Sequence, residues 1–125
     1  MPKNWTATRI ENRSGGGIPD LHIMANGLPF WVELKTTKGT RVSVRPHQIA
    51  WHSSYNRKRG LSFFLVKHLG TRHITVVRGS QAIDLAEKPL SEVQGSRFEA
   101  LGPLFSKIEN CVWDHYHGIV VERRG

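Results

Sequence analysis

The sequence predicts a single α/β domain, in which helices flank a central mixed β-sheet. The chain has 125 residues, enough to bury one hydrophobic core but too few for two. Two apolar runs separated by an Asn-Gly pair alternate with the period of strands, and a helical segment leads from them to two further apolar runs. This order is typical of a mixed sheet with helices packed on it.

The N-terminal part is expected to form a helix followed by a β-hairpin. Residues 4–12 have modest helical character, which the three glycines at 15–17 would end. Strands are predicted over 18–24 and 29–37. The Asn-Gly pair at 26–27 favours a tight turn between them, so the two strands should lie side by side.

The middle of the chain is expected to hold a second helix and two more strands. A helix is predicted over 46–59, because proline suits its first turn and glycine follows its end. The apolar runs 61–68 and 72–78 are predicted strands, and 80–85 either extends the sheet or connects onwards.

The C-terminal third, 85–125, has a weaker pattern. Residues 98–113 have helical character, which the Gly-Pro pair at 102–103 is expected to interrupt. A short terminal strand is predicted over 119–121. We expect this third of the chain to complete the fold or to form the interface of a dimer.

Basic residues are concentrated in one segment of the chain. The net charge is +8, with 18 Lys and Arg against 10 Asp and Glu. Residues 34–83 contain ten of these bases and no Asp or Glu at all. Since a carboxylate would repel a phosphate, a segment without acids suits a nucleic-acid partner.

Cysteine content and hydropathy indicate the compartment. The single cysteine, Cys111, excludes an internal disulfide framework. The apolar runs are far shorter than the roughly 20 residues of a membrane span. The N-terminus lacks the apolar stretch of a signal peptide. We therefore expect no membrane partner and a cytoplasmic location, in a bacterial or archaeal cell or in a host infected by a phage or virus.

Three charged side chains are expected to converge on the hairpin. Glu33 and Lys35 are two residues apart on a predicted strand, so both leave the same face, and the turn can bring Asp20 next to them. Two close carboxylates repel each other unless a cation lies between them, and hard oxygen ligands suit Mg²⁺ or Mn²⁺. The carbonyl of Leu34 is a plausible further ligand. A plain solvent-facing hairpin is the alternative interpretation.

These residues resemble the motifs of the PD-(D/E)XK nuclease superfamily. The resemblance lies in Gly17-Ile-Pro-Asp20, in Glu33-Leu-Lys35, and in the segment from Ser43 to Trp51, which is similar to the Ser-x-x-Gln helix motif of the virus-type replication-repair (VRR-NUC) branch. Two extra residues separate Ser43 from Gln48 in this chain. The motif core covers about residues 8–68. The resemblance implies a restriction-endonuclease-like fold and one nuclease domain over 1–125.

The resemblance also implies a role for each motif residue. Asp20 and Glu33 would be ligands of Mg²⁺, for which Mn²⁺ would substitute, and Lys35 would be the catalytic lysine. Gln48 would contact the metal-bound water or the scissile phosphate. Glu11 would be the acidic residue that many members carry on the first helix, reaching a metal or the substrate. A solvated helix carboxylate is the other interpretation of Glu11.

Basic and aromatic groups around the second helix are candidates for DNA contacts. Trp31 shares a face with Glu33 and would line the site, whereas Trp51 is predicted to pack in the core. The predicted contacts with the DNA backbone are Lys38, Arg41, Arg45, His47, His52, Tyr55, Arg57, Lys58 and Arg59.

The length and the motifs together predict a substrate. Small stand-alone members of the superfamily resemble Holliday junction resolvases, including those of archaeal viruses and bacteriophages, which act as homodimers in DNA recombination and repair. We therefore expect a structure-specific endodeoxyribonuclease that makes paired nicks in four-way junctions, with no small-molecule substrate. The alternatives are a nicking or restriction-type enzyme on the same fold, and a basic nucleic-acid-binding module without catalysis.

A separate zinc hypothesis concerns the C-terminal segment. Cys111, Asp114, His115 and His117 are ligand types that zinc uses, but their spacing matches no closed structural site. The alternative is a polar, aromatic-rich segment around Trp113, which could form a subunit contact.

Overall fold

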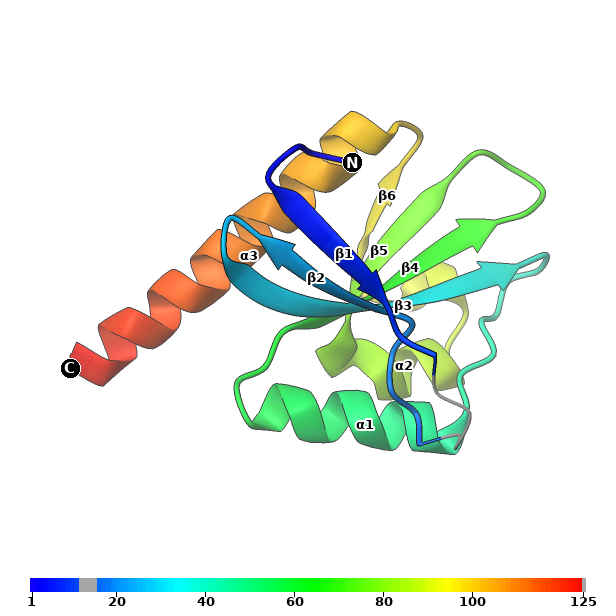
Figure 1. Cartoon of the computed structure of the whole chain (residues 1–125). Helices are drawn as coiled ribbons and strands as arrows, with labels where there is room; N and C mark the ends of the chain where they lie inside the picture. Colours follow the sequence, from blue (N-terminus) through cyan, green and yellow to red (C-terminus); the bar gives the residue numbers. More distant parts are fainter. Residues whose placement is uncertain (12–15, 125) are drawn as a thin grey trace.

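The protein folds into three layers, as the computed structural model shows for residues 1–11 and 16–124, with side chains to residue 118 (Figure 1). A mixed β-sheet forms the middle layer. Helices α1 (Pro46–Arg57) and α2 (Ala82–Glu87) cover one face of the sheet, and α3 (Leu101–Arg124) crosses the other. The predicted α/β class is confirmed. We call the two sides of the sheet the α1 face and the α3 face.

Within the described residues, six strands form the sheet and lie in the order of the sequence. All neighbouring strands are antiparallel except β3 and β4, which are parallel because α1 carries the chain back across the sheet between them. Short 3-10 turns over Gly79–Gln81 and Leu90–Glu92 flank α2. The strands are β1 (Trp5–Arg9), β2 (Leu21–Ala25), β3 (Leu28–Thr37), β4 (Ser62–His68), β5 (Ile74–Arg78) and β6 (Ser96–Phe98).

The predicted hairpin is confirmed as β2 and β3. Asn26 and Gly27 have φ angles of 53° and 80°, so both turn residues are left-handed. Such a turn matches the twist of the strands it joins, and Asn-Gly adopts it at little cost. The turn fixes the register that pairs Leu21 with Val32.

Several elements differ from the prediction. The helix expected over 4–12 is wrong, because β1 covers 5–9 of this segment and pairs with β2, while Asn12 lies outside the described residues. Only Trp5 of β1 is buried, so the strand lacks the apolar alternation that would have revealed it. The terminal strand expected over 119–121 is also wrong, because α3 continues through it. Pro103 does not interrupt α3, since it lies in the first turn, where the helix needs no backbone donor.

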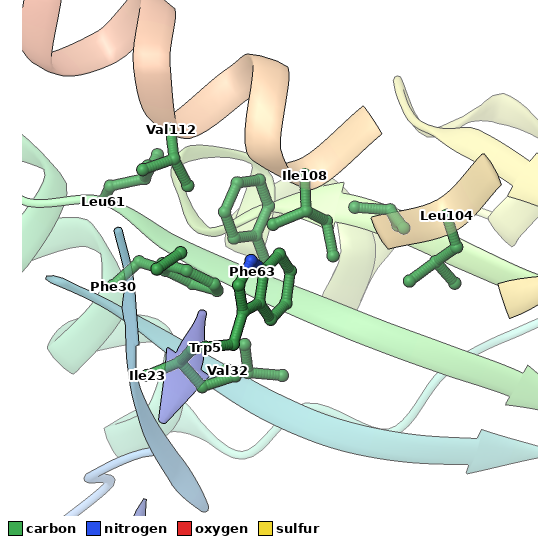
Figure 2. Packing of buried hydrophobic residues seen from close by; sticks show 11 residues of the cluster. Trp5, Ile23, Phe30, Val32, Leu61, Phe63, Leu104, Ile108 and Val112 are labelled. Carbon is green, nitrogen blue, oxygen red and sulfur yellow. The ribbon is translucent and has the colours of Figure 1, made fainter. Parts of the chain in front are cut away.

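A hydrophobic cluster joins α3 to the sheet (Figure 2). Trp5, Phe30 and Phe63 meet edge to face, with ring centroids 5.5 and 5.7 Å apart along the series. Leu104 and Ile108 project onto these rings from successive turns of α3. Among the described residues, no helix has both the length and the apolar character that a membrane crossing requires.

A second hydrophobic cluster fills the α1 face. It contains Phe64, Val66 and Val77 from the sheet and Leu85 from α2, with Ile49 of α1 packed against it. Strands β3 and β4 are therefore held between packed layers, which makes them a rigid support for side chains at their ends.

Candidate active site

Asp20, Glu33 and Lys35 meet on the α1 face of the sheet. Glu33 and Lys35 lie two residues apart on β3, so they leave the strand on the same side. Asp20 precedes β2, and the register that pairs Leu21 with Val32 places Asp20 opposite Glu33. The backbone N–H of Leu34 donates to Asp20 Oδ2 at 2.8 Å. The hairpin thus brings the two carboxylates and the ammonium together, as the sequence predicted.

The backbone three residues before Asp20 has a conformation and a close contact that require glycine, at Gly17. Its φ of 77° is left-handed, and a Cβ at this position would lie 2.2 Å from the backbone carbonyl oxygen of His47. The chain before Asp20 therefore touches the first turn of α1 directly, and only glycine fits there. On the other side, the N–H of Ile10 donates to the carbonyl of Asp20 at 2.8 Å. These contacts hold Asp20 between β1, β3 and α1.

Gln48 links the two motif residues of β3. Its Nε2 donates to Glu33 Oε1 at 2.7 Å, and its Oε1 accepts from Lys35 Nζ at 2.8 Å. The same oxygen accepts the N–H of Arg45, the residue before α1, at 3.0 Å. Because Gln48 lies in the first turn of α1, its side chain both caps the helix and orients Glu33 and Lys35.

The electrostatics of Glu33 are unusual for a carboxyl group. Its side chain is only 2% exposed. Burial raises the pKa of Glu33 to about 8, and the adjacent Asp20 contributes in the same direction, while Lys35 opposes the shift. Burial also lowers the pKa of Lys35, although Glu33 opposes this change. Without a cation, the site holds a carboxyl that resists ionisation beside a carboxylate.

This donor set fits a divalent cation. The pKa of Glu33 is raised mainly by burial and further by Asp20, and a cation between the two carboxyl groups would favour the ionised form of Glu33. Within the described residues, no third His, Cys, Asp or Glu joins the pair in a group that could hold a metal. Mg²⁺ binds through one or two carboxylates and completes its shell with water and substrate phosphate, so two carboxylates suffice. The role of the Leu34 carbonyl stays a prediction.

Glu11 is not brought into this group. Glu11 was expected on a helix, but the segment before it forms strand β1. Glu11 is exposed and lies two residues beyond the end of that strand. Glu11 does not join Asp20 and Glu33 in a metal-binding group of the described residues. The predicted position of Glu11 on a first helix is therefore wrong, because pairing with β2 made this segment a strand.

Most of the predicted DNA contacts are exposed. Arg45 and His47 lie at the start of α1, beside the site, and Arg57 and Lys58 lie at its other end. Arg41 is also exposed, but its Nη1 donates to the carbonyl of Glu87 at 2.6 Å, so this guanidinium ties the loop before α1 to α2. Of the other predicted DNA contacts, Lys38 and Arg59 are also exposed.

The prediction that His52 contacts DNA is wrong. Its side chain is fully buried, with 0% exposure, so it does not reach a DNA phosphate. Its Nδ1 lies 2.8 Å from Ser62 Oγ, and its ring packs 4.2 Å from that of Phe64. Burial lowers the pKa of His52 to about 4, and Lys35 contributes. His52 lies on the side of α1 that faces β4, which is why it is buried.

Four aromatic side chains lie next to the charged residues. Trp31 shares the face of Glu33, as predicted, and contacts Trp51 of α1 with ring centroids 5.5 Å apart. Trp51 was predicted to be a core residue, but it is half-buried, and the rings it contacts are those of Trp31, His52 and Tyr55. His22, which the sequence did not single out, is paired with Trp31 across β2 and β3. Its alternation with Asp20 was the available signal.

The residues of the zinc hypothesis have other contacts. His115 Nε2 lies 2.9 Å from the carbonyl oxygen of Arg59. The ring of His117 stacks on that of Trp113, with centroids 6.0 Å apart and an interplanar angle of 10°. In the part of the chain that the structure describes, Cys111 joins no group of ligands that could hold a metal.

No protein-family model matches this sequence, and a comparison with curated proteins found no significant match. The function is therefore inferred from the site itself.

Proposed function

We propose that the protein is a divalent-metal-dependent endodeoxyribonuclease of the PD-(D/E)XK type, with a restriction-endonuclease-like fold. The observation that carries this proposal is the set of Asp20, Glu33 and Lys35 on one face of the sheet, linked to α1 by Gln48. A plain solvent-facing hairpin would not bury its glutamate to 2% exposure beside a second carboxylate.

Each residue has a chemical role in phosphodiester hydrolysis. Asp20 and Glu33 would hold the cation, which when bound polarises the phosphate and lowers the pKa of a water molecule. Lys35 Nζ, whose pKa is lowered by burial, can exchange a proton with the attacking water or stabilise negative charge on the phosphate. Gln48 keeps this ammonium and Glu33 Oε1 in place through its two hydrogen bonds.

The order of the elements around the site supports the fold assignment. The metal-binding hairpin of β2 and β3 is followed by α1 and then by β4, which lies parallel to β3. Strand, strand, helix and strand in this order agree with the elements predicted for residues 18–68, which carry the resembling motifs. The chain departs from the expected pattern before the hairpin, where β1 takes the place of a helix.

DNA is the substrate that the charge distribution favours. Residues 34–83 contain no carboxylate, and exposed Arg45 and His47 lie beside the site. The first turn of α1 also faces the site, and the positive end of a helix favours a phosphate. A four-way junction is the substrate we propose, cut by a homodimer, because two symmetric nicks require two sites related by a twofold axis.

The first test compares a labelled four-way junction with a linear duplex of the same sequence. Each is incubated with Mg²⁺ or with EDTA, using the wild type, Glu33→Gln, and Glu92→Gln as a matched control at an exposed position. Paired nicks in the junction that disappear in EDTA and in Glu33→Gln, but persist in Glu92→Gln, are the expected result.

The other outcomes separate the alternatives. Equal cleavage of the linear duplex would leave a nuclease but remove the junction specificity. Tight binding of the junction with no cleavage in Mg²⁺ or Mn²⁺ would refute the catalytic proposal and favour a binding module.

A further inference from the structure

Four aromatic side chains form a continuous row on the α1 face, which we call the aromatic row. His22 contacts Trp31 with ring centroids 4.8 Å apart, and Trp31 contacts Trp51 at 5.5 Å. Trp51 then stacks on Tyr55 at 4.8 Å, with an interplanar angle of 21°. The row thus runs from β2 across β3 to α1.

The aromatic row is not part of the hydrophobic core. All four side chains are half-buried, and neither hydrophobic cluster of the described residues includes them. Two indoles, a phenol and an imidazole therefore lie at the edge of the core, where Trp51 contacts buried His52 with ring centroids 5.2 Å apart. Half-buried aromatic side chains that lie outside both clusters and beside a charged site are candidates for a binding surface.

The aromatic row lies directly beside the charged site. Trp31 is two residues before Glu33 on β3, a distance of roughly 7 Å along the strand, and both leave the same face. Trp51 follows Gln48 by three residues, which is about one turn of α1. A flat ligand on the row would consequently lie within one nucleotide of a phosphate bound at the cation that Asp20 and Glu33 would hold.

A pocket opens beside the stacked pair. It has a volume of about 440 Å³, and Trp51 and Tyr55 form part of its wall. His47, Ser54 and Lys58 supply its polar groups, and the described residues that line it include no carboxylate. Aromatic faces beside basic and hydroxyl groups are the chemistry that recognises a nucleobase together with its phosphate.

We propose that the aromatic row stacks an unpaired base of DNA next to the scissile phosphate. This inference rests on the proposed function and specifies its substrate as DNA in which base stacking is interrupted, as at a branch point or a gap. In a continuous duplex, every base is paired and stacked on its neighbours. The row cannot reach the face of such a base unless the base leaves the stack, which costs free energy.

The test compares two DNAs that differ only in their bases. Each is a duplex with a central three-nucleotide gap, in which the unpaired strand carries either thymidines or abasic residues. Both have the same phosphates, so the electrostatic contribution to affinity cancels. Binding is measured by fluorescence anisotropy in EDTA, so that no cleavage occurs. We expect the wild type to bind the thymidine gap roughly tenfold or more tightly than the abasic gap, the size of one base–aromatic stack.

Substitutions in the aromatic row test whether these side chains cause the preference for the thymidine gap. Trp51→Leu and Tyr55→Leu should each reduce the preference for the thymidine gap, while Trp113→Leu, which removes a 63% exposed indole on α3, should leave it unchanged. Circular dichroism and thermal melting confirm that each variant is folded. Equal binding of the two gaps by the wild type overturns the inference without reference to any variant, and so does a preference that persists in both row variants.

The outcome is independent of catalysis. Cleavage that requires Mg²⁺ and Glu33, combined with equal binding of the two gaps, would retain the nuclease and discard the aromatic row as a base-binding surface. A strong preference for the thymidine gap, combined with no cleavage of any DNA, would retain the row and discard the nuclease.

Discussion

The buried carboxyl of Glu33 should make the metal-free protein less stable as the pH rises. The pKa of Glu33 is raised from 4.5 to about 8, mainly by burial and further by Asp20. The folded state therefore holds this proton more tightly than the unfolded state does. The stabilising contribution of the protonated carboxyl is fully present below pH 4.5 and is lost as the pH rises through 8.

The expected magnitude follows from the difference in pKa. Each pH unit between the two pKa values corresponds to about 1.36 kcal/mol, so the range from 4.5 to about 8 corresponds to about 5 kcal/mol. Glu33→Gln has a similar volume and keeps an oxygen that can accept from Gln48, but it cannot ionise. In EDTA near pH 8, the variant should therefore be more stable than the wild type.

The assay is urea unfolding in EDTA at several values between about pH 5 and pH 8, followed by circular dichroism. The difference between wild type and Glu33→Gln isolates Glu33 from the other ionisable groups, and Glu92→Gln serves as the control. Adding Mg²⁺ near pH 8 should restore the stability of the wild type by mass action and leave Glu33→Gln unchanged. Parallel loss of stability in wild type and Glu33→Gln would refute the reasoning.

Three further predictions concern the frame around the site. Gly17→Ala should lower the free energy of unfolding by more than about 2 kcal/mol and abolish cleavage, because its Cβ would clash with the first turn of α1. The matched control is Gly27→Ala, whose backbone is also left-handed but whose Cβ would meet nothing within 4 Å. This variant should cost only about 1 kcal/mol in urea unfolding. His52 is buried with its pKa lowered from 6.5 to about 4, so stability present above 6.5 should be lost as the pH falls, by about 3 kcal/mol at about pH 4. An unfolding series in acid checks this loss, and His52→Gln should flatten it. Ile108→Ala should cost about 2–5 kcal/mol, while Ile83→Ala, at a 52% exposed position, should cost under about 1 kcal/mol in the same assay.

The structural features that were predicted correctly from the sequence depend on local interactions. The Asn26-Gly27 turn depends on the φ angles of two residues, and the shared face of Glu33 and Lys35 depends on the period of one strand. The start of α1 follows from Pro46, which suits the first turn of a helix. Each of these features is decided by residues a few positions apart, so the sequence reveals it directly.

The features that could not be predicted from the sequence depend on packing between distant segments. Residues 4–12 contain little apolar alternation, and the conformation of 5–9 was decided by pairing with β2 and by the burial of Trp5 under α3. The contact between Gly17 and α1 likewise joins segments that are thirty residues apart.

The sequence by itself determined the chemical groups of this protein, namely the hairpin with its two carboxylates and lysine and the acid-free basic segment around α1. Only the tertiary structure decided the environment of those groups. The way α1 packs on the sheet buries Glu33 and His52, bridges Glu33 to Lys35 through Gln48, and leaves Trp51 beside Trp31 at the surface. Side-chain identity sets which charges and rings are present, but burial and neighbours set their pKa values and their accessibility, and both depend on contacts between distant segments.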